Sequence, residues 1–214
     1  MKYVSIDIES TGVNVHEDEV LEFSAIFEDS KNLKTYSEIF KFTRILLYQR
    51  IAGSPFALDL NKDIIQIIGA HNEYPTKPEV WKSLLDKRFP EKNNLNYGVC
   101  YPKNLGHAFS EGLKPLLEED DIKKDHLTFN VAGKNIGGFD ALILSRLPNW
   151  NDKVRFRRRF VDPTTPFIDW ENDLIAPNLS ICKTRSNLSE VITHNSLEDA
   201  WDVIEVMRTQ YNRK

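Results

Sequence analysis

Two carboxylates, Asp7 and Glu9, stand two residues apart in an N-terminal segment that is otherwise mostly apolar. Residues 3–9 are rich in β-branched side chains and alternate, which predicts a strand. Residues two apart on a strand point to the same face, so both carboxylates leave the strand together. If that face is buried, the two like charges need a cation or several hydrogen bonds. The pair therefore indicates a cation site, and a solvent-facing edge strand is the alternative.

The residues that follow this pair favour the first interpretation. Ser10, Thr11 and Gly12 have the side chains of a turn and end the strand directly after Glu9. Both carboxylates then lie at the open end of a strand, where ligands usually bind.

A third acid, Asp140, follows the pair Gly137 and Gly138. A strand, a glycine turn and a helix start would place Asp140 in the first turn of a helix, where the dipole favours a negative charge. That interpretation needs no function. It leaves the glycine pair unexplained, since two glycines let another group approach the backbone closely.

A histidine and a fourth acid, His194 and Asp199, stand five residues apart near the C-terminus, with Asn195 and Ser196 between them as helix caps. In a chain with 32 acidic residues and 5 histidines this spacing is weak evidence by itself. The pair gains weight only together with the two other acidic positions.

Asp199 has a neighbour, Glu198, that competes for the same role. In the expected helix the apolar residues Leu197, Ala200 and Trp201 lie toward the core and flank the face that carries Asp199. Glu198 is therefore expected to be solvated, and Asp199 to be the functional acid.

The elements that must position these residues are read from hydrophobic periodicity. Three strands come first, then helices alternate with strands, and a helix with a strong i, i+3, i+4, i+7 pattern closes the chain. This order predicts an α/β or α+β fold around a single sheet. Strands are expected at residues 3–9, 20–27, 36–42, 126–132 and 154–161, the second and third as an antiparallel hairpin. Helices are expected at residues 60–68, 81–85, 138–147 and 196–211, and from Asn104 or Ser110 to 119.

The segment of residues 44–104 has the weakest pattern. Its prolines and asparagines indicate loops around the two short helices. It is expected to be either an insertion that covers a substrate or ordinary packing within one domain of residues 1–214, a length typical of a single domain.

The bulk composition excludes several classes of protein. The formal net charge is −4, from 28 Lys and Arg against 32 Asp and Glu, so a protein that coats long nucleic acid is disfavoured. No apolar stretch approaches the roughly 20 residues of a membrane span, so no membrane association is expected. Cys100 and Cys182 stand alone, which argues against a disulfide scaffold and suits a reducing cytoplasm.

Taken together, the acidic positions resemble the three motifs of the DEDDh exonucleases, the superfamily of proofreading subunits, ribonuclease T and oligoribonuclease. The first motif, Asp-x-Glu followed by Thr-Gly, stands at residues 7–12, and the third, His-x4-Asp, at residues 194–199. The second motif of the family reads His-Asn, three residues, Asp. Here Lys134 replaces that histidine, and four residues separate Asn135 from Asp140.

The resemblance implies a ribonuclease-H-like mixed β-sheet flanked by helices. It also implies 3′→5′ exonuclease activity, in which two ions of Mg²⁺ or Mn²⁺ are held by carboxylates and a histidine is the general base. Such ions prefer carboxylate oxygens, and a pair of them about 3.5–4 Å apart serves phosphodiester hydrolysis. Carried onto this chain, the metal ligands are Asp7, Glu9, Asp140 and Asp199, and the base is His194.

The resemblance also implies a substrate, the 3′ ends of single-stranded DNA or RNA. The corresponding contacts are expected at Thr11, Gly12, Val13, Asn135 and Phe139. Val13 and Phe139 are candidates for stacking on terminal bases, with a core role as the alternative for Phe139. Relatives are often dimers, so a homodimer is compatible with the resemblance. Choosing between RNA and DNA lies beyond these motifs.

A basic segment at residues 153–159 has five Lys or Arg among seven residues. If it is a strand, Arg155, Arg157 and Arg159 share one face and are placed to contact phosphate. A solvated edge strand that carries charge against aggregation explains the segment equally well.

Two other functions remain open from the sequence. One is a phosphodiesterase for short oligonucleotides or dinucleotides, which the modest acidity favours. The other is a catalytically silent nucleic-acid-binding module of the same fold, which the complete set of acids disfavours.

Overall fold

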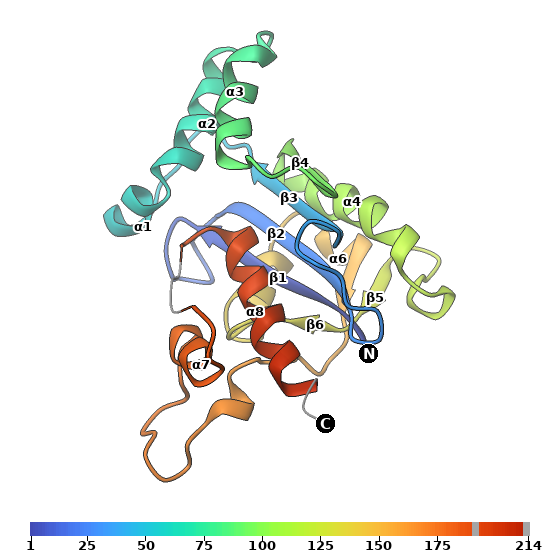
Figure 1. The fold of residues 1–214 in the computed structure, drawn as a ribbon. Helices are drawn as coiled ribbons and strands as arrows, with labels where there is room; N and C mark the ends of the chain where they lie inside the picture. The colour runs from blue at the N-terminus through green and yellow to red at the C-terminus, as the bar shows by residue number, and fades with distance from the viewer. Residues whose placement is uncertain (190–192, 212–214) are drawn as a thin grey trace.

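The computed structural model describes residues 1–189 and 193–211. It has a mixed α/β architecture in which helices cover both faces of a central sheet (Figure 1). The strands are β1 Lys2–Ser10, β2 Val20–Asp29, β3 Lys41–Leu46, β4 Leu95–Cys100, β5 Leu127–Phe129, β6 Val131–Ala132 and β7 Val154–Phe156. The helices are α1 Pro55–Leu60, α2 Lys62–Glu73, α3 Pro78–Arg88, α4 Pro102–Leu113, α5 Asp140–Ser145, α6 Trp150–Lys153, α7 Leu179–Arg185 and α8 Ser196–Tyr211.

The central sheet has the strand order β4-β3-β2-β1-β6 across the described residues. β1, β2 and β3 pair as an antiparallel meander, while β4 and β6 add to its two sides in parallel to β3 and β1. β5 and β7 form a separate parallel pair beside it. This is the mixed sheet flanked by helices that the sequence predicts.

Both faces of β1 are covered by helices, so both sets of its alternating side chains point into the interior. Val4, Ile6 and Ile8 face a core built with Phe109 of α4 and Trp150 of α6. The opposite face lies under α8, which crosses the sheet diagonally in Figure 1. The carboxylates of β1 therefore belong to a covered face and do not lie on a solvated edge strand.

The direction of the strands brings distant segments to one edge of the sheet. β6 runs parallel to β1, and Val4 and Ser5 pair with Val131 and Ala132. The chain therefore leaves β6 at the same edge as the carboxyl end of β1. The segment that leads to α5, residues 133–139, and the first turn of α8 meet at this edge.

A group of helices, α1 to α3, is inserted between β3 and β4 and projects from the sheet beyond β2 and β3 (Figure 1). It occupies residues 55–88 of the region 44–104, which has the weakest sequence pattern. α2 buries Ile64, Ile67 and Ile68, the spacing that the sequence pattern predicts. The same region also holds β4, an edge strand that the sequence analysis does not anticipate, because its polar and half-buried residues lack a clear alternation.

Several predicted boundaries are wrong for identifiable physical reasons. The third strand begins at Lys41, because residues 36–39 form a turn that precedes it. The basic strand ends at Phe156, so Arg155, Arg157 and Arg159 do not share one strand face. α4 begins at Pro102, a residue favoured in the first turn, and ends at Leu113, which leaves Ser110 inside the helix. The strand expected at residues 126–132 is divided between two sheets.

None of the helices in the described ranges is long and apolar enough to cross a membrane.

Candidate active site

Three carboxylates from two distant segments meet at the carboxyl end of β1. Asp7, Glu9 and Asp199 each place one oxygen so that all three oxygens lie within 4.8 Å of one another. β1 points the first two side chains to the face that α8 covers, and α8 supplies the third. The helix is fixed against β1 by the Ser5 hydroxyl, which donates a hydrogen bond of 2.7 Å to the Ala200 carbonyl.

Asp140 adds a fourth carboxylate beside this group. It is the first residue of α5 and is buried, as expected for an acid in a first helical turn. A backbone hydrogen bond from Ile8 lowers its pKa, which places the carboxylate against β1. Asp140 is also the strongest charged neighbour acting on the pKa of Asp7.

Burial raises the pKa of all four acids, and the charges of neighbouring acids raise those of Asp7, Glu9 and Asp199 further. Burial, then the charge of Asp140, raises the pKa of Asp7 well above its usual value. Burial, then the charge of Glu22, raises the pKa of Glu9 to about 8. Burial likewise raises the pKa of Asp140 to about 7 and that of Asp199 to about 6. A site that keeps four desolvated acids together is arranged for cations.

A further observation supports a divalent cation at these carboxylates. Asp199 Oδ1 is buried and has no hydrogen-bond partner among the described residues. A buried acceptor without a partner costs about 1–3 kcal/mol, so a native protein normally supplies one. With carboxylate oxygens as the only ligand atoms, the cluster matches hard cations such as Mg²⁺ or Mn²⁺.

His194 precedes the first turn of α8, the helix that carries Asp199. Its side chain is exposed, and it lowers the pKa of Asp199 electrostatically. Its backbone has a φ of 52°, a left-handed conformation. Asn195 then caps α8, because its Oδ1 accepts hydrogen bonds from the amides of Leu197 at 3.1 Å and Glu198 at 3.4 Å. Glu198 itself is exposed, as the sequence pattern predicts.

The turn after β1 is tightly closed by Asp18. The Thr11 hydroxyl donates to Asp18 Oδ1 at 3.0 Å and accepts from the Glu19 amide at 3.0 Å. Gly12 is packed against the Asp18 carboxylate, which leaves no space for a Cβ. Val13 is 88% exposed at the tip of this turn. The turn therefore presents an apolar side chain and the Gly12 backbone next to the carboxylates.

The glycine pair before Asp140 has a steric explanation. A Cβ on Gly137 would lie 2.7 Å from the ring of Phe160, and Gly138 is packed against the side chain of Asn135. Asn135 is exposed with a φ of 52°, and Phe139 is half-buried against the core. The additional residue in this segment thus accommodates a ring from the chain after β7.

Two residues near the site escaped the sequence analysis. Glu22 is fully buried on β2 directly opposite Glu9, and Arg88 at the end of α3 forms an ion pair with it. A signal for Glu22 was present, since it is the one charge within the apolar run of residues 20–23. Arg88 gave no signal, because the partner of a basic residue on a helix depends on tertiary structure.

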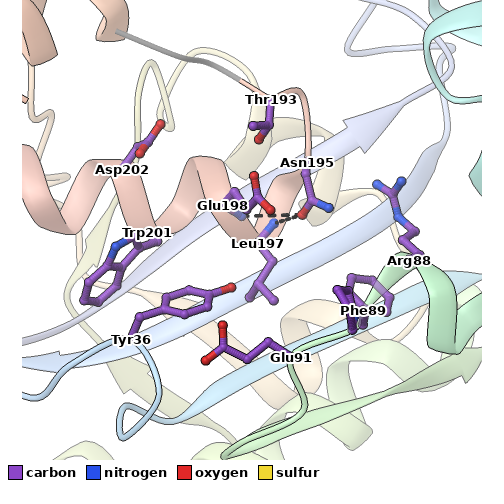
Figure 2. A pocket seen from close by; sticks show the side chains of 11 residues that line it. Tyr36, Arg88, Phe89, Glu91, Thr193, Asn195, Leu197, Glu198, Trp201 and Asp202 are labelled. Atoms are coloured by element: carbon purple, nitrogen blue, oxygen red, sulfur yellow. Dashed lines mark hydrogen bonds between the residues drawn. The ribbon is translucent and has the colours of Figure 1, made fainter. Parts of the chain in front are cut away.

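A cavity of about 480 Å³ opens beside this region, between the end of α3 and the first turns of α8 (Figure 2). Tyr36, Phe89 and Trp201 provide aromatic walls, and Arg88 and Asn195 also line the cavity. The cavity thus lies against the first turns of α8, the helix that carries Asp199.

The raised pKa values predict an unusual pH dependence of stability. Each acid binds its proton more tightly in the folded than in the unfolded protein, so the free energy of unfolding of the metal-free protein falls as pH rises from about 5 to about 8. Each unit of pKa shift is worth about 1.4 kcal/mol. Thermal melts in EDTA across this range should therefore show a melting temperature that declines by several degrees.

Saturating Mn²⁺ should remove most of that decline, because the bound ion keeps the carboxylates charged in the folded state. A melting temperature in EDTA that stays level or rises between pH 5 and pH 8 would contradict the electrostatic account of the cluster.

Comparisons with known proteins identify the fold. No protein-family profile matches the chain, and no curated protein matches its sequence. Among solved structures, cell-death related nuclease 4 (CRN-4) matches 99% of the chain with a TM-score of 0.57 and 12% identity. Exonuclease I from Methylocaldum szegediense matches all of it with a TM-score of 0.55 and 14% identity. E. coli exonuclease I in complex with a dA16 oligonucleotide matches it with a TM-score of 0.50 and 15% identity.

The chain spans 64% of the CRN-4 chain and 41% of each exonuclease I chain. A zinc-bound E. coli exonuclease I complex with single-stranded DNA matches to a similar extent, with a TM-score of 0.50. The sheet order, the helices on both faces and these matches agree, so this chain has the ribonuclease-H-like fold found in these nucleases.

Proposed function

We propose that this protein is a metal-dependent exonuclease that removes nucleotides from the 3′ end of single-stranded nucleic acid. The observation that carries the proposal is the meeting of four acids from three distant segments, with a buried Asp199 oxygen left without a partner. The fold shared with CRN-4 and exonuclease I supports the same class of reaction.

Asp7, Glu9, Asp140 and Asp199 would hold the cations, and the charges of the other three acids all raise the pKa of Asp7. Bound there, Mg²⁺ or Mn²⁺ would supply an activated water and stabilise the charge that develops on the phosphate. The protein contributes a rigid frame, since each carboxylate is carried by a strand or by the first turn of a helix.

We assign His194 the role of general base. Its exposed side chain and its electrostatic effect on Asp199 support this assignment. Its Nδ1 or Nε2 would take the proton of the attacking water, and the exposed ring would then return that proton to solvent.

The residues around the cluster favour an unpaired strand end. Val13, exposed at the tip of the turn, offers an apolar surface for a base, and base stacking on such surfaces tolerates any sequence. The Thr11 hydroxyl and the Gly12 carbonyl are both engaged within the turn, so the Gly12 amide is the backbone group that we assign to the substrate. Asn135 and the half-buried Phe139 are proposed to contact the nucleotide from the opposite segment.

The proposal is tested with 5′-labelled single-stranded RNA and the matching DNA, each incubated with Mg²⁺, Mn²⁺ or EDTA and resolved on a gel. A ladder that shortens from the 3′ end only with metal is expected, and the faster strand identifies the preferred sugar. Labelled dinucleotides test the short-substrate alternative, which predicts cleavage of dinucleotides with stalling on long strands. A folded protein that cleaves none of these substrates would refute the proposal.

A further inference from the structure

Two glutamates face each other across the antiparallel pair β1 and β2 at the candidate site. Glu9 and Glu22 are directly paired in the register, so their side chains leave the same face of the sheet. Glu22 is fully buried, whereas Glu9 is 8% exposed. Like charges opposite each other destabilise a sheet, and a buried carboxylate requires a partner. The strand pair therefore cannot be stable without a compensating group.

Arg88, the last residue of α3, supplies that group from the inserted helices. Its Nε donates to Glu22 Oε2 at 2.5 Å and its Nη2 to Glu22 Oε1 at 3.0 Å, a two-pronged ion pair. Its Nη1 forms an ion pair with Asp63 of α2. The Arg88 side chain is only 8% exposed. Two carboxylates on different elements thus fix the guanidinium in one position.

Glu22 also connects this ion pair to the start of α8. Its Oε1 lies 2.6 Å from the hydroxyl of Ser196, the first residue of the helix. The Ser196 hydroxyl is also 2.7 Å from that of Ser24, which donates to Thr43 on β3 at 2.9 Å. The network thus runs from the inserted helices through β2 to the helix that carries the fourth acid.

The position of Ser196 gives this network its importance. It lies two residues after His194 and three before Asp199. Figure 2 shows Arg88 extending from α3 toward the segment that holds Asn195. In the sequence, Asn195 lies between His194 and Asp199. Glu22 therefore connects Arg88 to the first residue of the helix that carries Asp199.

We propose that Arg88 is a positioning residue for the carboxylate site, acting through Glu22 on Glu9 and on the first turn of α8. This proposal rests on the proposed function and extends it: the inserted helices are part of the catalytic framework, because they deliver the guanidinium that compensates the charge of Glu22 beside the cluster. Without Arg88, Glu22 is buried without a counter-charge next to Glu9, and the carboxylate that accepts from the Ser196 hydroxyl is no longer held in place.

The test compares Arg88→Ala, Arg88→Lys and the double variant Arg88→Met/Glu22→Gln with the wild-type protein. Lys92→Ala is the matched control, because Lys92 pairs with Asp86 just beyond α3 on the exposed surface. Three quantities are measured well below each melting temperature: Mn²⁺ affinity by electron paramagnetic resonance without substrate, and kcat and KM on a single-stranded oligonucleotide.

Loss of a residue that supports metal ligands typically lowers metal affinity or activity about 10–100-fold, and this range is expected for kcat and Mn²⁺ affinity in Arg88→Ala. KM should change less than about twofold. The kcat and Mn²⁺ affinity of Arg88→Lys should lie between those of the wild type and those of Arg88→Ala, since lysine keeps the charge but loses the two-pronged geometry. The double variant should recover part of the loss, because no buried charge is left unpaired. Lys92→Ala should match the wild type.

Folded Arg88→Ala and Arg88→Lys proteins with wild-type kcat and Mn²⁺ affinity would overturn the proposal and leave Arg88 as a support of the inserted helices only. A double variant as impaired as Arg88→Ala would overturn the route through Glu22. If the wild-type protein hydrolyses no substrate, the proposed function fails, while the Mn²⁺ titration still decides whether Arg88 positions the carboxylates.

Discussion

Replacing Asp7 by Asn is expected to abolish hydrolysis and, at the same time, to raise the melting temperature of the metal-free protein. Asp7 shares the cluster with three other acids, so its loss removes a ligand central to the site. The expected fall in kcat is at least about 10³-fold, since metal ions contribute several kcal/mol and each 1.36 kcal/mol is tenfold in rate.

The gain in stability has the same origin. The Asp7 carboxyl is desolvated and repelled by its neighbours, and Asn keeps its volume without its charge. Removing that repulsion is expected to contribute about 1–3 kcal/mol at pH 8, and each kcal/mol corresponds to roughly 2–4 °C for a domain of this size. Gel assays and melts in EDTA measure the two effects on one preparation.

Glu198→Gln is the matched control for this experiment, because it removes one carboxylate near the site from an exposed position. It should retain activity and melt close to the wild type. An Asp7→Asn protein that stays fully active would refute the site assignment. One that is inactive but melts at a lower temperature in EDTA would refute the repulsion argument.

Replacing His194 by Asn should lower kcat by about 10²–10⁴-fold, the usual contribution of a general base, while Mn²⁺ binding survives. Asn is the appropriate substitute because His194 has a φ of 52°, and Asn accepts this left-handed conformation better than Ala. The change therefore removes the proton acceptor with little strain in the turn that precedes α8.

The measurement is single-turnover hydrolysis together with a Mn²⁺ titration. His107→Ala, an exposed histidine of α4, is the control and should behave as the wild type. Partial recovery of the His194→Asn variant by added imidazole would support proton transfer at this position. Loss of Mn²⁺ affinity as large as the loss of kcat would instead indicate that His194 acts through the metal ligands and not as a base.

Local sequence patterns predicted the helices and strands in which apolar residues repeat with one regular period. The helix of residues 196–211 was predicted at its observed bounds, because its apolar residues repeat at helical spacing against one covered sheet face. Residues 3–9 fall within β1, since alternation and β-branching agree there. The order of such elements predicted an α/β or α+β fold around a single sheet, and the resemblance to the DEDDh exonucleases implied that the sheet is mixed and flanked by helices.

The same patterns were less informative where burial depends on distant partners. β4 escaped prediction because an edge strand lacks a clear alternation, and the third strand was placed five residues too early because an aromatic turn imitates a strand. In the basic segment, Phe156 ends the strand and Arg157 instead pairs with Asp121, which lies far away in the sequence.

At the candidate site the division is similar. Composition and spacing predict which acids are available and that Asp7 and Glu9 share a face, because strand geometry has a period of two. The folded chain was needed to show that α8 covers that face and that Arg88 compensates Glu22. It was also needed to show that Asp199 lies among these acids with an oxygen that has no partner among the described residues. The reason is physical: spacing along a chain specifies local directions, whereas desolvation and charge pairing depend on groups that folding brings together from distant segments.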